Sequence, residues 1–370
     1  MTLTIEGFRD RVIDQARSQR HPVSCLFELT PVCNLRCHFC YVALDPYAGP
    51  YLTTAEVCRI IDIIERAGVL WLTFTGGEVF SRRDFPEIYA YAKRKGLLVT
   101  IFTNATMVNE RIAAMLREDP PFSVEVSIYG ADAEHYEGTT QIPGSFKRFD
   151  RGVRLLQEAG VPLLLKSPIT TLNADHVPEL IAYAHDRGIP FRYDTSVDAR
   201  HDGGKEPTLY RISARKVKAV RQEIEELKTQ QPWPLAECGV GPPPGEGTRE
   251  LYTCGAGRTA FFIDALGQAS HCVIDRDPSF PILARPWDDL WQAMGEWVTQ
   301  PLPDEAPCSG CNLRSACHNC PARSRLATGS PYLKDTYQCD VTHEWYGLPP
   351  LAHPADNYRA AARQLGACTT

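Results

Sequence analysis

Three cysteines stand within eight residues near the start of the chain, Cys33, Cys37 and Cys40, in the spacing C-x3-C-x2-C. Thiolates are soft ligands that favour iron–sulfur clusters or zinc. A [4Fe–4S] cluster has four irons, so three cysteines would leave one iron free to bind something else. Zinc needs four ligands, of which His38 would supply one, although its place between Cys37 and Cys40 makes convergence on one ion difficult. The third alternative is three cysteines without a metal.

A second set of cysteines lies in the last third of the chain. Cys254 and Cys272 stand at the outer ends of a predicted β-hairpin, in which residues 259–263 and 268–272 flank the turn 264–267. Five more follow, the first four spaced C-x2-C-x5-C-x2-C: Cys308, Cys311, Cys317, Cys320 and Cys339. This density predicts a metal site, and on spacing alone a zinc ribbon is the alternative to iron and sulfur.

The composition is that of an ordinary globular protein. The 370 residues are 44% hydrophobic and 23% charged, enough for a large core and two domains. The formal charge of −6 gives no general attraction to nucleic acid or to an anionic membrane. Because residues 1–20 lack the apolar run of a signal peptide and no segment is long enough to span a membrane, we expect a cytoplasmic protein. Disulfides are rare there, so 14 cysteines require a metal explanation.

Short apolar runs alternate with helical patterns between residues 20 and 195. Strands are predicted at 23–29, 70–75, 97–103, 122–129, 161–167 and 190–194, and helices at 5–20, 53–68, 84–96, 108–118, 145–159, 175–187 and 212–230. The continuously apolar strands are typical of a parallel sheet covered on both faces. Six βα units therefore predict an open, partial barrel, in which chemistry takes place at the carboxyl ends of the strands.

Polar and glycine residues follow each predicted strand. The cysteine loop follows the first strand, and the other five end in 75–78 (Thr-Gly-Gly-Glu), 103–104 (Thr-Asn), 127–130 (Ser-Ile-Tyr-Gly), 166–168 (Lys-Ser-Pro) and 193–195 (Tyr-Asp-Thr). Each has a purely structural alternative, because Gly-Gly-Glu also forms turns and Asn104 or Ser127 can bond its own backbone. Their gathering at one rim beside three thiols predicts a ligand site.

The sequence resembles the radical S-adenosylmethionine (radical SAM) enzymes. Two motifs carry the resemblance: Cys33, Cys37, Phe39 and Cys40 after the first strand, and the Gly-Gly-Glu of residues 76–78 after the second. The resemblance implies a partial (β/α)6, TIM-like barrel over residues 21–200 and a [4Fe–4S] cluster whose unique iron binds SAM. It also implies the cofactor contacts: Gly76, Gly77 and Glu78 to the methionine amino group, Asn104 and Ser127 near the ribose, and the backbone at Phe39 against the adenine. Lys166 is a further cofactor-binding candidate. Val79 stands where many members have proline.

The C-terminal cysteines resemble the SPASM extension of radical SAM enzymes, which holds two auxiliary [4Fe–4S] clusters. By this resemblance Cys254, Cys272 and Cys320 bind one cluster, and a second set binds the other: Cys308, Cys311, Cys317 and Cys339. Cys238 is the candidate fourth ligand of the first. The predicted layout is an N-terminal helix (1–20), the barrel, a linker and helix (201–235), the SPASM domain with its β-hairpin (236–345) and a tail (346–370).

The resemblance to SPASM peptide maturases implies a radical SAM enzyme that removes a hydrogen atom from a ribosomally made peptide. The product would carry a thioether, a carbon–carbon crosslink or another oxidised side chain. Candidate proton acceptors are Tyr193, Asp194 and Asp198. The expected partners are the precursor peptide and a one-electron reductant of the flavodoxin or ferredoxin type, with leader binding either on a separate protein or on the barrel itself. The alternatives are oxidation of a small molecule or tetrapyrrole side chain, and a non-catalytic iron–sulfur or zinc protein.

Overall fold

The computed structural model describes residues 5–42, 50–230, 249–311, 313–314, 317 and 320–349. Its strands are β1 (Ser24–Thr30), β2 (Trp71–Gly76), β3 (Leu98–Thr103), β4 (Ser123–Ser127), β5 (Leu163–Pro168), β6 (Phe191–Asp194), β7 (Ala260–Ile263), β8 (Gln268–Ser270) and β9 (Ser279–Pro281). Every predicted strand up to residue 195 is present. Their ends lie within two residues of the prediction, and the hairpin over 259–272 is confirmed as β7 and β8.

Every predicted helix is also present. They are α1 (Ile5–Gln19), α2 (Thr54–Arg66), α3 (Phe85–Arg94), α4 (Glu110–Glu118), α5 (Ala133–Thr140), α6 (Ser145–Glu158), α7 (Val177–His185), α8 (Ala214–Gln230), α9 (Trp287–Thr299), α10 (Pro321–Thr328) and α11 (Thr336–Trp345), with two 3-10 turns, η1 (Val79–Ser81) and η2 (Glu206–Tyr210). The sequence patterns did not predict α5, α9, α10 or α11. The last two are only 8 and 10 residues long and have weak amphipathic patterns.

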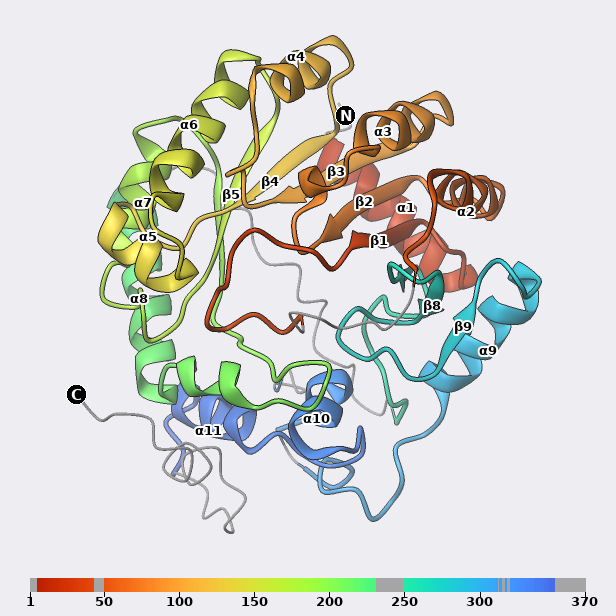
Figure 1. Ribbon diagram of the computed structural model, residues 1–370. Helices are drawn as coiled ribbons and strands as arrows, with labels where there is room; N and C mark the ends of the chain where they lie inside the picture. Colours follow the sequence, from red (N-terminus) through yellow and green to blue (C-terminus); the bar gives the residue numbers. More distant parts are fainter. Residues whose placement is uncertain are drawn as a thin grey trace.

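The strands form one sheet in the order β6-β5-β4-β3-β2-β1-β7-β8-β9, and β1 to β6 are parallel throughout. The predicted open, partial barrel is confirmed. The hairpin does not stand apart from it, because β7 pairs in parallel with β1, with Ser24 opposite Ala260. Figure 1 shows α2, α3, α4, α6 and α7 around the outer face of the strand arc, with α10 and α11 across its open side. The C-terminal region thus completes the wall that the six strands leave open.

Local signals explain where several helices begin and end. Thr53 caps α2 through a reciprocal capping box with Glu56. Asp84 precedes α3, but its side chain does not cap it; its carboxylate binds Arg82 at 2.8 Å and accepts from the Thr54 hydroxyl instead. Four glycines that end helices, at 68, 96, 160 and 188, have φ between 62° and 95°, where a side chain is strained.

Side chains on the two faces of the strands have different surroundings. Those toward the helices are fully buried, such as Phe27, Phe74 and Val126. Those toward the inside of the barrel stay partly exposed, such as Phe102 and Lys166, because a cavity lies there. The prediction of a sheet covered on both faces therefore holds for the helix side, while the inner face lines a ligand-sized space.

Buried contacts join the C-terminal region to the barrel. Arg211, which follows η2, pairs with Asp335 before α11 at 3.2 Å, and both side chains are buried. On the other side, the indole nitrogen of Trp291 in α9 donates to the carbonyl of Arg20 at 2.8 Å.

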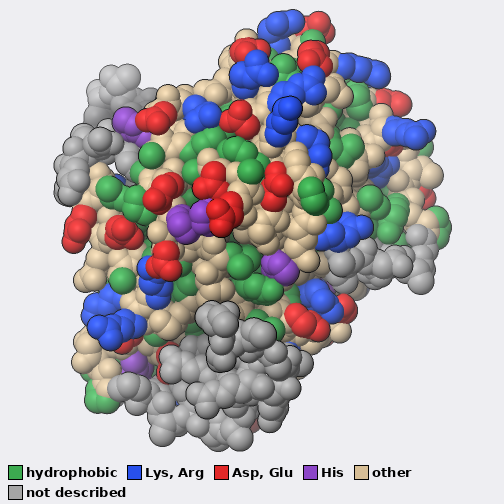
Figure 2. Space-filling view, turned by 60° about the vertical axis from the view of Figure 1, so that its left-hand side comes forward, with side chains coloured by type: hydrophobic (Ala, Val, Ile, Leu, Met, Phe, Trp, Pro, Cys, Tyr) green, Lys and Arg blue, Asp and Glu red, His purple; other side chains and the backbone are tan. Residues whose placement is uncertain are grey.

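Figure 2 shows acidic and basic side chains interspersed over the face that comes forward from the left of Figure 1. Among the described helices, none is long and apolar enough to cross a membrane.

Candidate active site

A cavity of about 800 Å³ occupies the carboxyl ends of the strands. The predicted cofactor and cluster residues that line it are Cys33, Cys37, Phe39, Cys40, Gly76, Gly77, Asn104, Ser127 and Lys166. The three candidate proton acceptors line it too: Tyr193, Asp194 and Asp198. Val273, Ile274 and Arg323 come from the C-terminal region and close the cavity on that side. The volume lies in the range of sites that enclose a small molecule.

The cysteine loop is held by hydrogen bonds within the loop and from other elements. The Cys33 thiol accepts from the backbone N–H of Leu35 at 3.4 Å and from the Asn104 side-chain amide at 3.8 Å. Backbone N–H groups of Arg36 and His38 donate to the carbonyls of Thr140 and Thr139 at the end of α5. An α5 that the sequence did not predict therefore positions the loop.

Burial is the main influence on the three thiols. It raises the pKa of Cys33 to about 11, with Glu78 and Cys40 adding to the effect against opposing hydrogen bonds. Burial also raises the pKa of Cys37, and the neighbouring thiols of Cys40 and Cys33 raise it further. The pKa of Cys40 is raised by burial as well. Arg200 opposes the shift at Cys40, but burial outweighs it, so the clustered thiols remain protonated at neutral pH. A cationic metal group reverses this preference, so the donor set fits an iron–sulfur cluster.

Close backbone approach explains the two glycines after β2. A Cβ on Gly77 would lie 2.5 Å from the carbonyl oxygens of Pro31 and Val32, just before the cysteine loop. Gly76 has φ +153°, and a Cβ there would lie 2.2 Å from the carbonyl oxygen of Thr30. The N–H of Gly77 donates to that same oxygen at 2.8 Å. Glycine is therefore required for the ends of β1 and β2 to meet, and both residues still face the cavity.

Glu78 lies beneath the cavity and does not line it. Its side chain is 1% exposed and accepts from the Thr103 hydroxyl at 2.7 Å and from the backbone N–H of Asn104 at 2.8 Å. The carboxylate thus fixes the end of β3 to that of β2. Asn104 does line the cavity, and its side chain donates to Asn34 at 3.1 Å and accepts from Thr106 at 2.6 Å. This network connects β3 to the cysteine loop.

Tyr129 is a site residue that the sequence analysis did not single out. Its hydroxyl lies within hydrogen-bonding reach of the Cys37 thiol and of the Ser127 side chain. Its ring packs edge-on against Phe39, with centroids 5.5 Å apart. Burial, with Cys37 and Tyr136 beside it, raises the pKa of Tyr129 well above its ordinary value, so the hydroxyl keeps its proton to donate. Its position two residues after Ser127, at the end of β4, was the available sequence signal.

Lys166 shares one carboxylate with a second cation. Its Nζ lies 3.5 Å from Glu125 and 2.8 Å from the centroid of the Phe102 ring, and Arg192 pairs with the same carboxylate. Burial lowers the pKa of Lys166 to about 7; Glu125 opposes this shift and Arg192 reinforces it. Lys166 therefore changes charge near neutral pH, and it does so on the cavity wall.

The candidate proton acceptors Asp194 and Asp198 are both ion-paired with Arg323. The distances from its guanidinium are 3.7 Å and 3.2 Å, and Asp198 is 8% exposed. Burial lowers the pKa of Arg323, but Asp198 and Asp194, with Cys320 nearby, raise it by more. Arg323 thus connects the barrel rim to a C-terminal cysteine. It was missed in the sequence, where its place three residues after Cys320 was the only signal.

The C-terminal cysteines converge as two separate groups. Cys254 and Cys320 lie beside Cys272, whose pKa is raised to about 12 by burial and by these two thiols. The second group encloses a cavity of about 60 Å³ and consists of Cys308, Cys311, Cys317 and Cys339. The grouping is the one that the resemblance implied. Cys238 lies outside the described residues.

The described residues do not form the single-ion site that either zinc alternative requires. The His38 ring stacks on that of Tyr210, with centroids 4.9 Å apart. Within the described ranges, no three cysteine, histidine or carboxylate side chains lie close enough to hold a single metal ion. Thiols spread around a wider space suit a cluster, in which each thiolate binds a different iron.

Known proteins with a similar sequence are consistent with this geometry. The family described as "Radical SAM superfamily" matches residues 27–184. PqqA peptide cyclase of Granulibacter bethesdensis is 32% identical over 168 residues, which are 45% of this chain and 45% of the relative. AdoMet-dependent heme synthase of Methanosarcina barkeri is 26% identical over 85% of this chain and 95% of the relative. Mycofactocin maturase MftC of Mycolicibacterium smegmatis is 26% identical over 92% of this chain and 88% of the relative.

A solved structure shares the fold. That of Streptococcus suis SuiB bound to the precursor peptide SuiA matches 89% of this chain and 79% of SuiB, with a TM-score of 0.69 and 15% identity. At that identity the likeness establishes the fold alone.

The fold and the cavity define an α/β protein with an open parallel barrel and a three-cysteine loop at its mouth. With the family match over β1 to α7, the chain contains a radical SAM domain. The match to PqqA peptide cyclase spans less than half of that relative.

Proposed function

We propose that this chain is a radical SAM enzyme that modifies a peptide. The observation that carries the proposal is the meeting of three clustered thiols, the Gly76-Gly77 backbone and the polar ends of the other strands in one enclosed cavity. Cys33, Cys37 and Cys40 would hold a [4Fe–4S] cluster with one iron open to SAM. Bound together, the cluster and SAM supply reductive cleavage to methionine and a 5′-deoxyadenosyl radical, which removes a hydrogen atom from the substrate.

The residues around the thiols would bind and orient SAM. Gly76 and Gly77 present backbone to its methionine end, and the backbone at Phe39 lies against the adenine. Asn104 and Ser127 lie near the ribose. Glu78 acts from beneath by holding the strand ends in register, and Lys166 offers a cation on the wall.

The C-terminal wall would exclude water from the reacting atoms. Val273 and Ile274 face the cavity from the segment that follows Cys272. Such a wall matters because a carbon radical attacks most C–H bonds within reach. Asp194, Asp198 and Tyr193 are the proposed proton acceptors as the product forms, and Arg323 holds both carboxylates at the cavity edge.

The two C-terminal thiol groups would hold auxiliary [4Fe–4S] clusters. The four-cysteine group is complete in itself. The group of Cys254, Cys272 and Cys320 has three ligands, and we propose Cys238 or an outside ligand as its fourth. The three-cysteine group is the one nearer the proposed proton acceptors, because Arg323 interacts with both Cys320 and the two carboxylates, and we propose that it takes an electron from the substrate.

A ribosomally made peptide is the proposed substrate class. Support comes from the peptide cyclase, similar over 45% of this chain, and from the maturase MftC, similar over 92% of this chain. The product would be a thioether, a carbon–carbon crosslink or another oxidised side chain. A flavodoxin- or ferredoxin-type reductant and a separate leader-binding protein are the proposed partners.

A small-molecule substrate is the second candidate. It is favoured by the heme synthase, which is similar over 85% of this chain. In that case the cavity would receive a tetrapyrrole side chain in place of a peptide side chain.

Anaerobic incubation with SAM, reductant and each short peptide encoded in neighbouring genes tests the proposal by mass spectrometry. The expected result is one peptide that loses two hydrogens while 5′-deoxyadenosine accumulates. If 5′-deoxyadenosine forms, no peptide changes and a porphyrinogen carboxylate side chain is oxidised, the second candidate replaces the first.

A further inference from the structure

A second cavity, of about 730 Å³, lies away from the reaction site. Its wall includes Arg20, His21 and Pro22, which precede β1, and Ala67, which follows α2. These residues stand at the amino ends of the strands, whereas the thiols stand at the carboxyl ends. Since β1 has 7 residues, the strand alone separates the two sites by about 20 Å. A ligand of this cavity is therefore not the reacting group.

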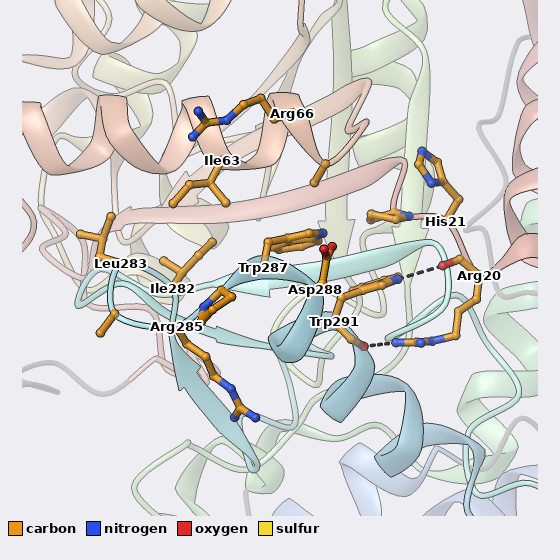
Figure 3. A pocket seen from close by; sticks show the side chains of 14 residues that line it. Arg20, His21, Ile63, Arg66, Ile282, Leu283, Arg285, Trp287, Asp288 and Trp291 are labelled. Carbon is orange, nitrogen blue, oxygen red and sulfur yellow. Dashed lines mark hydrogen bonds between the residues drawn. The ribbon is translucent and has the colours of Figure 1, made fainter.

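Two tryptophans from α9 form the floor of the cavity. Trp287 and Trp291 stack with centroids 5.7 Å apart and an interplanar angle of 14°. Figure 3 shows Ile63, Ile282 and Leu283 beside them, from α2 and the segment after β9. An aromatic floor with aliphatic walls is a setting for an apolar side chain of a ligand.

Arg20 makes the floor a fixed part of the fold. Its guanidinium donates to the carbonyl oxygens of Trp291 and Gly257, and the Trp291 indole donates back to the Arg20 carbonyl (Figure 3). Gly295 leaves room for this side chain, because a Cβ there would meet the guanidinium. The platform is thus held before any ligand arrives, which lowers the entropy cost of binding.

The rim is positively charged. Arg66 and Arg285 line it together with Arg20, against the single carboxylate of Asp288. Among the described residues, no carboxylate lies within ion-pair distance of Arg66 or Arg285. Elsewhere, the face in Figure 2 mixes both signs. Arg66 interacts electrostatically with Asp62 at longer range, and the Arg285 guanidinium lies 4.9 Å from the centroid of the Phe280 ring. Guanidinium groups that are not held in a carboxylate ion pair, beside an apolar floor, complement a chain that alternates carboxylates with apolar side chains.

We propose that this cavity docks an acidic, apolar-anchored segment of the peptide substrate, outside the residues that react. This inference rests on the proposed function. An extended segment of about ten residues spans roughly 35 Å, enough to connect the docking cavity to the reaction cavity around the barrel. Docking at one end of the sheet holds the reacting end near the other, which raises its effective concentration there.

The test uses the full, cluster-loaded chain under anaerobic conditions and two labelled probes of about twelve residues. One contains glutamate, leucine and phenylalanine, and in the other every glutamate is lysine. Fluorescence anisotropy should show binding of the acidic probe only. The double variant Arg66→Glu, Arg285→Glu should weaken it at least about tenfold, and Trp287→Ala should weaken it as well.

The matched control is Arg111→Glu, Arg117→Glu, which makes the same charge change on exposed residues of α4 and should leave binding unchanged. The inference is overturned by any of three results: the two probes bind equally well, the Arg66/Arg285 variant binds the acidic probe as tightly as the wild-type chain does, or the acidic probe does not bind. 5′-Deoxyadenosine formation is measured on the same preparations. If it persists without probe binding, only the docking inference fails; if it is absent while the probe binds, the proposed function fails.

Discussion

Two thiol sites in this chain differ in how much space they enclose. Cys33, Cys37 and Cys40 open into a cavity of about 800 Å³ lined by the ends of parallel strands. The group around Cys308 and Cys339 encloses about 60 Å³ and contains four cysteines. Three thiols beside a large cavity suit a cluster that must also bind a ligand, whereas four thiols around a small space suit a cluster that is fully held by protein.

The residues around the two sites also differ in polarity. The three-thiol site has polar groups from several strands, among them Asn104, Tyr129 and Lys166. At the four-thiol site, the hydroxyl of Thr342 lies 3.3 Å from the Cys317 sulfur, and pocket residues such as Leu302 and Tyr332 are mostly apolar or aromatic. Under the proposed function, chemistry would take place at the first site, and the second would move or store electrons.

Cys37→Ala should have the largest effect, since it removes a ligand of the open site. We expect 5′-deoxyadenosine formation to fall by about a thousandfold or more, and iron to fall by about four atoms from about twelve per chain. Chromatography of the nucleoside and anaerobic iron analysis check both. Cys58→Ala, in α2, is the control. Retained SAM cleavage in Cys37→Ala would break the distinction between the two sites.

Cys311→Ala should separate electron transfer from SAM cleavage. The open site is untouched, so we expect 5′-deoxyadenosine formation without peptide to stay within about threefold, while iron again falls by about four. Peptide turnover should drop by about a hundredfold, because the electron path is lost. Unchanged peptide turnover in a chain that lacks this cluster would assign the four-thiol group a structural role only.

Lys166 gives the open site a pH dependence. Its pKa in the folded chain is about 7, below the ordinary 10.5, so between pH 7 and 10 the unfolded chain binds more protons. The free energy of unfolding should therefore rise with pH in this window, by about 3 kcal/mol, and Lys166→Met should remove the rise. Anaerobic urea unfolding at several pH values measures it. Parallel curves for variant and wild type would contradict the assignment.

Tyr129→Phe should have the smallest effect. It removes a hydrogen bond to Cys37, so the reduced cluster loses on the order of 1 kcal/mol of stabilisation and its potential becomes more negative. Potentiometric titration followed by electron paramagnetic resonance detects the shift. Thr342→Val makes the corresponding change at Cys317 and should leave the SAM-binding cluster unmoved. If both variants shifted the reduction potential of the same cluster, the two sites would not be separate.

Much of the barrel was predictable because its signals are local. Apolar runs bounded by glycine place β1 to β6, and the Thr53–Glu56 capping box places the start of α2. The clustering of Gly76, Gly77 and the cysteine loop followed from the rule that parallel strands place their carboxyl ends together. The resemblance to the SPASM pattern also anticipated how the C-terminal cysteines divide into two groups.

What the sequence did not predict depends on contacts between distant residues. The pairing of β7 with β1 joins residues more than 230 positions apart, and no local pattern specifies it. Arg323 meets Asp194 and Asp198 only because α10 crosses the open side of the barrel. Glu78 was expected in the cavity, but the turn after Gly77 directs its side chain beneath β3, where Thr103 and Asn104 satisfy it.

Formation of 5′-deoxyadenosine by the wild-type chain tests the central claim most directly. The protein is loaded with iron and sulfide under anaerobic conditions and mixed with SAM and dithionite. If the open site at Cys33, Cys37 and Cys40 binds and cleaves SAM, the nucleoside accumulates to at least one equivalent per chain. A preparation with about twelve irons per chain that yields none at any reducing potential contradicts the account.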